Sequence, residues 1–514
     1  MKQEYEALQK EMQRIADVQN AAALLMWDQE TYMPAKGAAF RAQQLAALSG
    51  IAHDQFTAEE MGTRIERLDE ENSLSSDQAL NVKRIREDQE KASRYGTDFV
   101  QELSKAQSEA FQAWQQAKEK DDFERFAPEL ERIVDLKQKE ANLLGYEDHP
   151  YDALLDNFEP GLKTQKLEKV MEELREGLDP LLHAIHSCEV PDDSVMYGNY
   201  PTDRQWDQSM EILRTMGYDM EKGRQDLSTH PFTISFSPED VRVTTRMKEN
   251  DLHEAIWSSI HEGGHALYEQ GLPIDTYGLP QSEACSLSVH ESQARLWENI
   301  IGRGRPFWEY FHPRLQERFP EQLGATSLDA FYQAMNVVRP GLIRTNADEL
   351  SYHFHIIIRF EIEKGLIEGS IEVKDVPDQW NEKVRRYLGI EVPSDAQGCL
   401  QDIHWAHGGI GYFPTYSLGS LMSAQFYDQA CKELPELEKH IAKGELLPMR
   451  EWLRERIHSH GRLERPEELC ERVTGDSLDP QAFLNYAREK YGKLYSLEEG
   501  ARKTGKGKEE ASPE

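Results

Sequence analysis

The feature that most restricts the fold of this chain is the spacing of its apolar residues, which is helical along nearly the whole sequence. Residues 1 to about 190 are rich in Glu, Lys, Gln, Leu and Ala, with apolar residues three and four positions apart and breaks at TYMPAKG and GYEDHPYD. The one clear strand signal is at 233–236 and 241–245, with SPED as the turn. Helical patterns then resume, apart from an aromatic, loop-rich stretch at about 395–418. The sequence therefore predicts an all-α, mostly helical fold with one small β-hairpin.

The charge of the chain excludes one class of partner. It carries 59 Lys and Arg residues against 93 Asp and Glu residues, a formal net charge of −34. A surface this acidic repels polyphosphates, so we expect neither nucleic acid nor an anionic membrane as a partner. No apolar run approaches the roughly 18 residues of a membrane span, and the amphipathic N-terminal pattern lacks a signal-peptide core. The five scattered cysteines form no CxxC pair, so we expect a protein of the reducing cytoplasm.

The stretch SSIHEGGHALYEQG, which follows the hairpin, predicts a helix with a metal-binding face. Its start is marked by Asp251 and Glu254 in a capping-box pattern, and its end by Gly271. His261 and His265 stand four residues apart, so their imidazoles project from one face and can ligate one ion. The alternative is a pair of core or solvated histidines.

The two glycines between these histidines need a reason. Each glycine inside a helix costs about 1 kcal/mol relative to alanine. On the helical wheel Glu262 lies on one flank of the histidine pair and Gly264 on the other, so Gly264 clears space beside the metal. Gly263 points to the far side, where we expect close backbone packing.

Catalytic zinc takes three protein ligands and keeps one position open. The third histidine of the metzincin pattern is absent here. The next helix, expected at about 282–301, carries Glu291 on an apolar stripe, where a carboxylate is costly unless it is paired or metal-bound. We predict Glu291 as the third ligand, with half of a buried salt bridge as the alternative. Glu283 and Glu298 lie nearer the helix ends and are expected to be solvated.

These parts predict a reaction class. The ion lowers the pKa of bound water and polarises a carbonyl, while Glu262 accepts the water's proton and passes it to the leaving amine. The predicted reaction is amide hydrolysis.

Several short motifs, in order, resemble the Taq-type thermostable metallocarboxypeptidases. They are WDQETYMP, YDALLDNFEPG, HPF (230–232), DVRVT (240–244), HEGGH with HESQ (290–293), IRTNAD (343–348), GCLQDIHW (398–405) and GYFPTY (411–416). The resemblance implies a helical, cleft-bearing fold related to the neurolysin-like oligopeptidases, and a homodimer. It also implies a zinc or cobalt ion held by the residues matching His261, His265 and Glu291. Its activity would be removal of single C-terminal amino acids from peptides with broad specificity, C-terminal proline being disfavoured.

A carboxypeptidase must bind the terminal carboxylate of its substrate, and a guanidinium does so in a bidentate manner. Arg344 is the first candidate and Arg242 the second, each with a bracing ion pair as the alternative. Arg242 lies on the second hairpin strand, whose edge we expect to be open to an extended peptide. Gln401 and Asp402 complete the candidate substrate-binding set, Asp402 alternatively as an acceptor that holds another side chain.

An amide hydrolase also needs donors for the oxyanion, and Tyr or His commonly serve in helical metallopeptidases. The candidates are Tyr416, Tyr412, His230 and His404. The two tyrosines flank a Gly and Pro turn, so we expect only one of them to touch substrate.

The chain is expected to form one helical catalytic unit with a central cleft over 1–499, divided into an N-terminal part, 1–190, and a metal-bearing part, 191–499. The low-complexity residues 500–514 are expected to be disordered. Two other functions stay open at this point: an endo-oligopeptidase that uses the same metal site, and a helical peptide-binding protein without catalysis.

Overall fold

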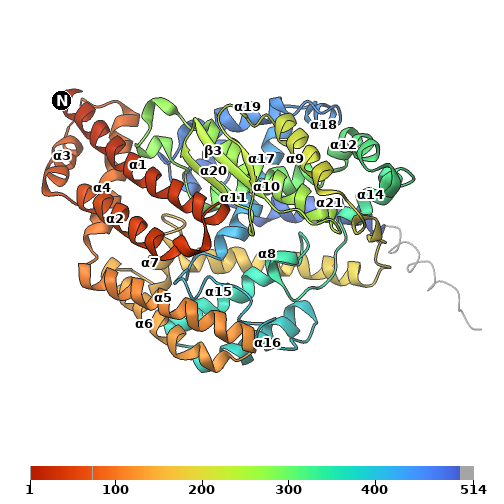
Figure 1. Cartoon of the computed structure of the whole chain (residues 1–514), viewed down its shortest axis with the longest axis horizontal. Coiled ribbons are helices and arrows are strands. Elements are labelled where there is room, and N and C mark those ends of the chain that lie inside the picture. Colours follow the sequence, from red (N-terminus) through yellow and green to blue (C-terminus); the bar gives the residue numbers. More distant parts are fainter. Residues whose placement is uncertain (1, 72, 498–514) are drawn as a thin grey trace, which may run out of the picture.

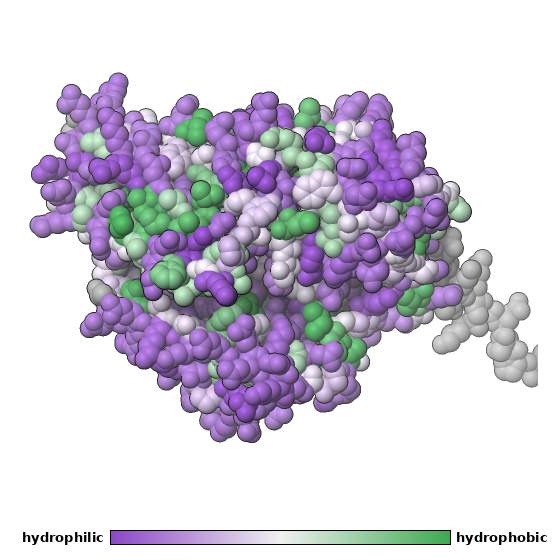
Figure 2. Space-filling view, viewed as in Figure 1, coloured by the Kyte–Doolittle hydropathy of each residue, from purple (hydrophilic) through white to green (hydrophobic). Residues whose placement is uncertain are grey.

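The computed structural model of the protein describes residues 2–71 and 73–497. Helices dominate these residues, as the apolar spacing predicted. Figure 1 shows them in an upper and a lower group, and Figure 2 shows a hollow between the two groups on the same face. Within the described ranges, no helix is both long and apolar enough to cross a membrane. The expected disordered tail, 500–514, lies outside the described residues.

The N-terminal helices pack around an apolar cluster of their own, which includes Leu8, Ile65, Val82 and Ile85. These helices are α1 (Lys2–Thr31), α2 (Ala38–Phe56), α3 (Glu59–Asp69) and α4 (Ser76–Ser93). The helices from α5 onward share a second, much larger core. The helices of the N-terminal region thus divide between the two clusters, α1 to α4 contributing to the first and α5 to α8 to the second.

The lower group lies beneath the hollow that Figure 2 shows, and its helices can be followed in Figure 1. It consists of α5 (Thr97–Lys120), α6 (Ala127–Leu144), α7 (Pro150–Leu155), α8 (Thr164–His186), α15 (Tyr352–Glu368) and α16 (Val376–Leu388). Of these, α15 is buried on nearly every side, which explains its apolar sequence YHFHIIIRF.

The upper group holds the helix with the two histidines, and α11 packs between α10 and α17. Its first members are α9 (Thr202–Met216), α10 (Leu252–Gly271), α11 (Leu287–Arg295), the π-helical segment η6 (Leu296–Gly302), α12 (Arg305–Arg318), α13 (Pro320–Leu323) and α14 (Leu328–Met335). The C-terminal members are α17 (Pro414–Glu433), α18 (Leu437–Ile441), α19 (Leu447–Arg456), α20 (Pro466–Thr474) and α21 (Pro480–Leu494).

The predicted hairpin is present and has a third strand beside it. Strands β2 (Thr233–Ser237) and β3 (Asp240–Thr245) pair antiparallel, and β1 (Gln225–Leu227) pairs parallel to β3. The strand order is β1-β3-β2, so β3 is flanked on both sides. The prediction that β3 offers an open edge to a peptide is therefore wrong. β1 has only three residues, too few to show alternation in the sequence.

Candidate active site

Helix α10 begins and ends where its sequence signals place it. The Asp251 side chain accepts a hydrogen bond from the amide of His253 at 2.9 Å and so caps the N-terminus. The second half of the predicted capping box is absent, because Glu254 pairs with Arg246 and Lys248 instead.

The two glycines of α10 face different neighbours. A Cβ added at Gly264 would lie 2.7 Å from Cα of Ala294, in the backbone of α11. A Cβ added at Gly263 would meet a side chain, that of Leu213 on α9, at the same distance. Close backbone packing thus occurs at Gly264, and its prediction at Gly263 is wrong. The tight approach of α11 at Gly264 is what brings Glu291 near the histidines.

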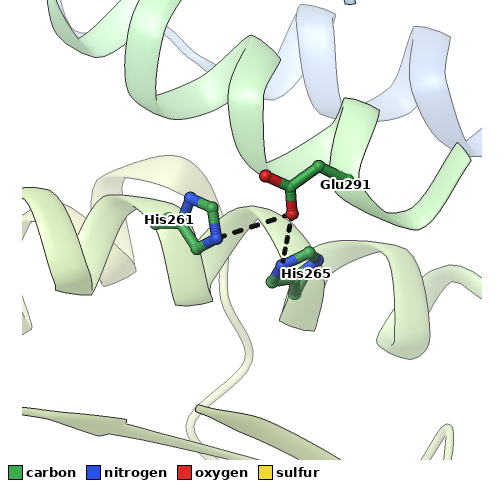
Figure 3. A group of neighbouring side chains, drawn as sticks. All are labelled: His261, His265 and Glu291. Atoms are coloured by element: carbon green, nitrogen blue, oxygen red, sulfur yellow. Dashed lines mark ion pairs between the residues drawn. The ribbon is translucent and has the colours of Figure 1, made fainter. Parts of the chain in front are cut away.

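The structure brings the three predicted metal ligands together, in what we call the ligand group: His261, His265 and Glu291. Glu291 Oε2 lies 3.8 Å from His261 Nε2 and 3.6 Å from His265 Nε2, and the three ligand atoms all lie within 4.8 Å of one another. Figure 3 shows both imidazoles projecting from α10 toward Glu291 on the facing helix. Ligands about 2 Å from one tetrahedral ion are separated by about 3.3 Å. The group therefore needs little movement to close on a divalent cation.

The other ring nitrogens are oriented as metal-binding histidines require. His261 Nδ1 lies 2.9 Å from Glu298 Oε2, and His265 Nδ1 lies 3.1 Å from the carbonyl oxygen of His290. These contacts place the Nδ1 proton on the outer side of each ring and leave both Nε2 atoms for the ion. The residues therefore fit a site for a divalent metal ion.

The helix that carries Glu291 starts later than expected. It begins at Leu287, because the hydroxyl of Ser286 accepts a hydrogen bond from the amide of Val289 and caps it. It then continues as the π-helical segment η6, a form that occurs often at functional sites.

Glu298 lies within η6 and is only 7% exposed, so the expectation that it is solvated is wrong. Although its burial alone would raise the pKa, the hydrogen bond to His261 and the charges of Arg303 and Arg295 hold it below its usual range. Arg295 Nε donates to Glu291 Oε1 at 2.6 Å, and its guanidinium also lies 3.7 Å from Glu298. Arg295 therefore separates two carboxylates that would otherwise repel one another.

The predicted general base, Glu262, is 6% exposed and lies beside the ligand group. Its Oε2 accepts a hydrogen bond from the hydroxyl of Thr233 on β2 at 2.7 Å. Burial raises the pKa of Glu262, while His261 and Thr233 oppose that rise. The hairpin thus positions the base.

Arg344 lies in a buried group of charges that we call the arginine cluster: Arg344, Arg359 and Asp402. Asp402 accepts from Arg344 Nη2 at 2.8 Å and from Arg359 Nε at 2.7 Å. Arg344 Nη1 also donates to the hydroxyl of Tyr352 at 3.0 Å. Arg344 is 6% exposed and Arg359 is fully buried. Asp402 therefore acts as an acceptor that holds two arginines, the second of its two predicted roles.

The side chain of Gln401 is hydrogen-bonded to backbone on both sides. Its amide oxygen accepts from the backbone N–H of Arg344, and its amide nitrogen donates to the carbonyl oxygens of Leu342, Gln397 and Gly398. Both ends of the side chain thus hold backbone, and Gln401 braces the residue that carries the Arg344 guanidinium.

Arg242, the second candidate for carboxylate binding, is engaged elsewhere. It forms two hydrogen bonds with Asp240, at 2.9 and 2.8 Å. Its guanidinium also lies 4.6 Å from the ring of Trp27 on α1 and 4.9 Å from that of Phe236. These contacts match the bracing alternative.

The structure groups three of the four candidate oxyanion donors. The rings of Tyr412 and Tyr416 are 5.4 Å apart, and His404 Nε2 lies 3.4 Å from the Tyr416 hydroxyl. Burial and the nearby Glu291 carboxylate raise the pKa of Tyr412, and burial lowers the pKa of His404 to about 4. All three groups are therefore neutral at pH 7. His230 stands apart: it is exposed, and no described residue hydrogen-bonds its ring.

The loop between α16 and α17 carries Asp402, His404 and Tyr412, and one buried acid holds it. Glu363 on α15 accepts hydrogen bonds from the indole of Trp405 at 2.8 Å and from the amide of Gly411 at 2.9 Å. Burial raises the pKa of Glu363 to about 7, although these donors oppose the rise.

The interpretation of the sequence missed four residues of the site: Thr233, Arg295, Tyr352 and Arg359. A signal existed for Arg359, since it stands alone in the apolar run YHFHIIIRF, where a charge needs a partner. Arg295 lies four residues after Glu291, the spacing of an ion pair on one helix face. Thr233 and Tyr352 have no comparable signal.

Comparison with known proteins shows clear similarity along the chain. The sequence model of the family described as carboxypeptidase Taq (M32) metallopeptidase matches residues 7–491. Thermostable carboxypeptidase 1 of Thermus thermophilus is 42% identical over 504 residues, covering 96% of this chain and 99% of the relative. Carboxypeptidase 1 of Bacillus subtilis is 38% identical over 488 residues, covering 95% and 97%. The crystal structure of an M32 carboxypeptidase from Deinococcus radiodurans is 39% identical, with a TM-score of 0.95 over 96% of this chain and 100% of that one.

Proposed function

The chain belongs to the carboxypeptidase Taq (M32) family of metallopeptidases and is a metal-dependent carboxypeptidase, and from that premise we propose which residues perform each part of the reaction. His261, His265 and Glu291 hold the ion. When bound, the ion supplies a Lewis acid that activates water and polarises the scissile carbonyl. Zinc is the first choice, because two imidazoles and one carboxylate leave the open fourth position of a catalytic zinc site, and cobalt is the alternative. Elemental analysis of the purified protein identifies it.

Glu262 moves the proton. The Thr233 hydroxyl occupies its Oε2, and among the described residues Oε1 has no hydrogen-bond partner. Oε1 therefore takes the proton of the attacking water and delivers it to the nitrogen of the leaving amino acid. The raised pKa of the buried carboxyl increases its affinity for that proton.

The donors for the oxyanion come from the loop before α17 and the first turn of that helix. Tyr416 and Tyr412 are neutral hydroxyl donors close to Glu291, and the neutral His404 orients the Tyr416 hydroxyl. One tyrosine touches the substrate. His230, which is exposed, is the fourth candidate donor.

Arg344 binds the terminal carboxylate of the peptide. Three of its five N–H groups are used, by Asp402 and Tyr352, and two are left. The arginine cluster carries two positive charges and one negative charge, so one positive charge is uncompensated. A substrate carboxylate supplies the missing negative charge.

The substrates are peptides from which single amino acids are released with broad specificity, C-terminal proline being disfavoured, as the family resemblance implies. The same resemblance supports a homodimer. Light scattering on the protein as it elutes from a size-exclusion column measures the molar mass and tests this. All five cysteines are free, which supports a cytoplasmic location.

The single observation that carries this assignment is the meeting of His261, His265 and Glu291 beside Glu262. The test compares one short peptide as the free acid and as the C-terminal amide, with product identification. We expect release of the last residue from the free acid and little cleavage of the amide. Equal cleavage of both forms would indicate the endo-oligopeptidase, and binding without cleavage would indicate the peptide-binding protein.

A further inference from the structure

Tyr352, the first residue of α15, lies between two arginines. The guanidinium carbon of Arg295 is 4.5 Å from the centre of its ring, and Arg344 Nη1 donates to its hydroxyl at 3.0 Å. The ring is 6% exposed and also meets Tyr416 edge to face at 6.1 Å. A cation over an aromatic face is attracted to it, and more strongly when water is excluded.

Arg295 and Arg344 contact different parts of the site. Arg295 Nε holds Oε1 of Glu291, whose other oxygen faces His261 and His265. Arg344 belongs to the arginine cluster. Tyr352 is thus a direct contact between the residues around the metal ligands and the residues around the substrate carboxylate.

The hydroxyl proton of Tyr352 has no hydrogen-bond acceptor among the described residues. Its oxygen accepts from Arg344, but no atom of the described residues accepts its own proton. A buried hydroxyl normally finds an acceptor for that proton. Arg344 has two unused N–H groups beside it. The three free donors are matched by a carboxylate, which has two oxygens and about four lone-pair positions.

We propose that the Tyr352 hydroxyl donates to the C-terminal carboxylate of the peptide beside Arg344, while the face of its ring holds Arg295 and thereby the metal ligand Glu291. This inference rests on the proposed function. It makes Tyr352 a substrate-binding residue through its hydroxyl and a positioning residue for Glu291 through its ring.

The two roles are separable because they use different atoms. Tyr352→Phe removes the hydroxyl and keeps the ring, whereas Tyr352→Leu removes both and keeps an apolar side chain. If Tyr352 only packed the core, either substitution would change the binding of the free-acid and the amidated peptide by the same factor. The matched control is Tyr387→Phe, the same change at a half-buried tyrosine whose hydroxyl bonds Glu361, away from the site.

The experiment measures binding without turnover. The zinc-loaded Glu262→Gln protein is titrated calorimetrically with tetra-alanine as the free acid and as the C-terminal amide. Adding Tyr352→Phe is expected to weaken free-acid binding about tenfold or more, the effect of one hydrogen bond to a charged group, and to leave amide binding within about twofold. The Tyr387→Phe control is expected to change neither. Equal dissociation constants for the free acid with and without Tyr352→Phe would overturn the substrate-binding role.

The second measurement is the release of zinc to a chromophoric chelator. Tyr352→Phe is expected to leave the release unchanged, and Tyr352→Leu to weaken zinc affinity about tenfold, as loss of a contact behind a ligand does. Unchanged zinc affinity in Tyr352→Leu would overturn the positioning role. If that variant fails to fold, the Tyr352→Phe comparison alone still decides the first role.

Failure of the proposed function gives a different result. In that case the Glu262→Gln parent would itself bind the free acid and the amide equally, and the arginine cluster would not be a carboxylate site at all. A parent that prefers the free acid, combined with a Tyr352→Phe variant that keeps the full preference, would overturn the inference about Tyr352 alone.

Discussion

The region around the ligand group and the arginine cluster both bury ionised side chains, but carboxylates outnumber guanidiniums in the first and guanidiniums outnumber carboxylates in the second. Around the histidines, the carboxylates of Glu262, Glu291 and Glu298 face the guanidiniums of Arg295 and Arg303. Although burial alone would lower it, the charge of Glu291 and the hydrogen bond to Glu298 raise the pKa of His261 to about 9, so a proton on this imidazole balances the third carboxylate. A buried carboxylate without a partner is costly, so a cation that displaces this proton takes over its charge.

The arginine cluster shows the reverse balance. Arg344 and Arg359 face the single carboxylate of Asp402, which leaves +1. The neighbouring histidines do not alter the sum, because burial lowers the pKa of His355 to about 3 and that of His404 to about 4. The kind of group in excess in each region thus corresponds to its proposed ligand: carboxylates to a metal ion in the first, guanidiniums to a carboxylate in the second.

The largest expected effect comes from neutralising the base of the metal region. Glu262→Gln leaves the ligand group intact, so the ion is retained, but an amide cannot accept the proton of water. We expect kcat to fall about 10³-fold or more. Metal content and peptide hydrolysis are measured on the same sample. A nearly normal rate in a metal-loaded variant would contradict the role of Glu262.

The next largest effect is expected from Arg344→Ala, which removes the excess positive charge of the arginine cluster. In Arg344→Ala, Asp402 keeps Arg359 as its partner, so the cluster becomes neutral and loses its attraction for a carboxylate. We expect kcat/KM for a free-acid peptide to fall about 10²- to 10³-fold, with metal content unchanged.

The control for this variant is Arg242→Ala, which removes an arginine already paired with Asp240. Arg242→Ala is expected to lower kcat/KM for free-acid peptides less than Arg344→Ala does. Loss of the ion from Arg344→Ala would show instead that Arg344 supports the metal region.

The two glycines of α10 test how tightly the metal region is packed. Gly264→Ala places a methyl group against backbone of α11, which cannot yield, and we expect the free energy of unfolding to fall by about 3 kcal/mol, with weaker metal binding. Gly263→Ala meets the end of the Leu213 side chain, which can move, and is expected to cost about 1 kcal/mol. Urea denaturation of the pair measures the difference. Equal losses would contradict the distinction between backbone and side-chain neighbours.

The smallest expected effect is a pH-dependent change in stability at Glu363, which holds the loop between α16 and α17. Folded Glu363, with its pKa near 7, keeps a proton that the unfolded chain loses near its ordinary value of 4.5. The folded state therefore loses stability as pH rises from about 4.5 to 7, and Glu363→Gln has no such loss. The destabilisation caused by Glu363→Gln should shrink by roughly 2 kcal/mol between pH 5 and pH 8. Urea midpoints at the two pH values measure it, and a constant difference would contradict the raised pKa.

The parts of the site that could be predicted from the sequence are those whose residues lie close together along the chain. His261, His265 and Glu262 share one helix, so a rotation of 100° per residue places them without a structure. The solvent exposure of Glu298 was predicted wrongly, because whether the end of a helix is solvated depends on the segments that pack over it. The contacts of Gln401 could not be predicted for a similar reason: its motif identified the segment, but only the fold shows that its amide bonds backbone.

The sequence by itself determined the helical class, the hairpin, the histidine pair and the place of Glu262 beside that pair, because each depends on a local period of the chain. Only the tertiary structure decided that α11 approaches α10 at Gly264, that β3 is an inner strand, and that two arginines share Asp402. Those outcomes depend on contacts between segments far apart in sequence, and their energies come from burial and charge pairing that no local pattern encodes.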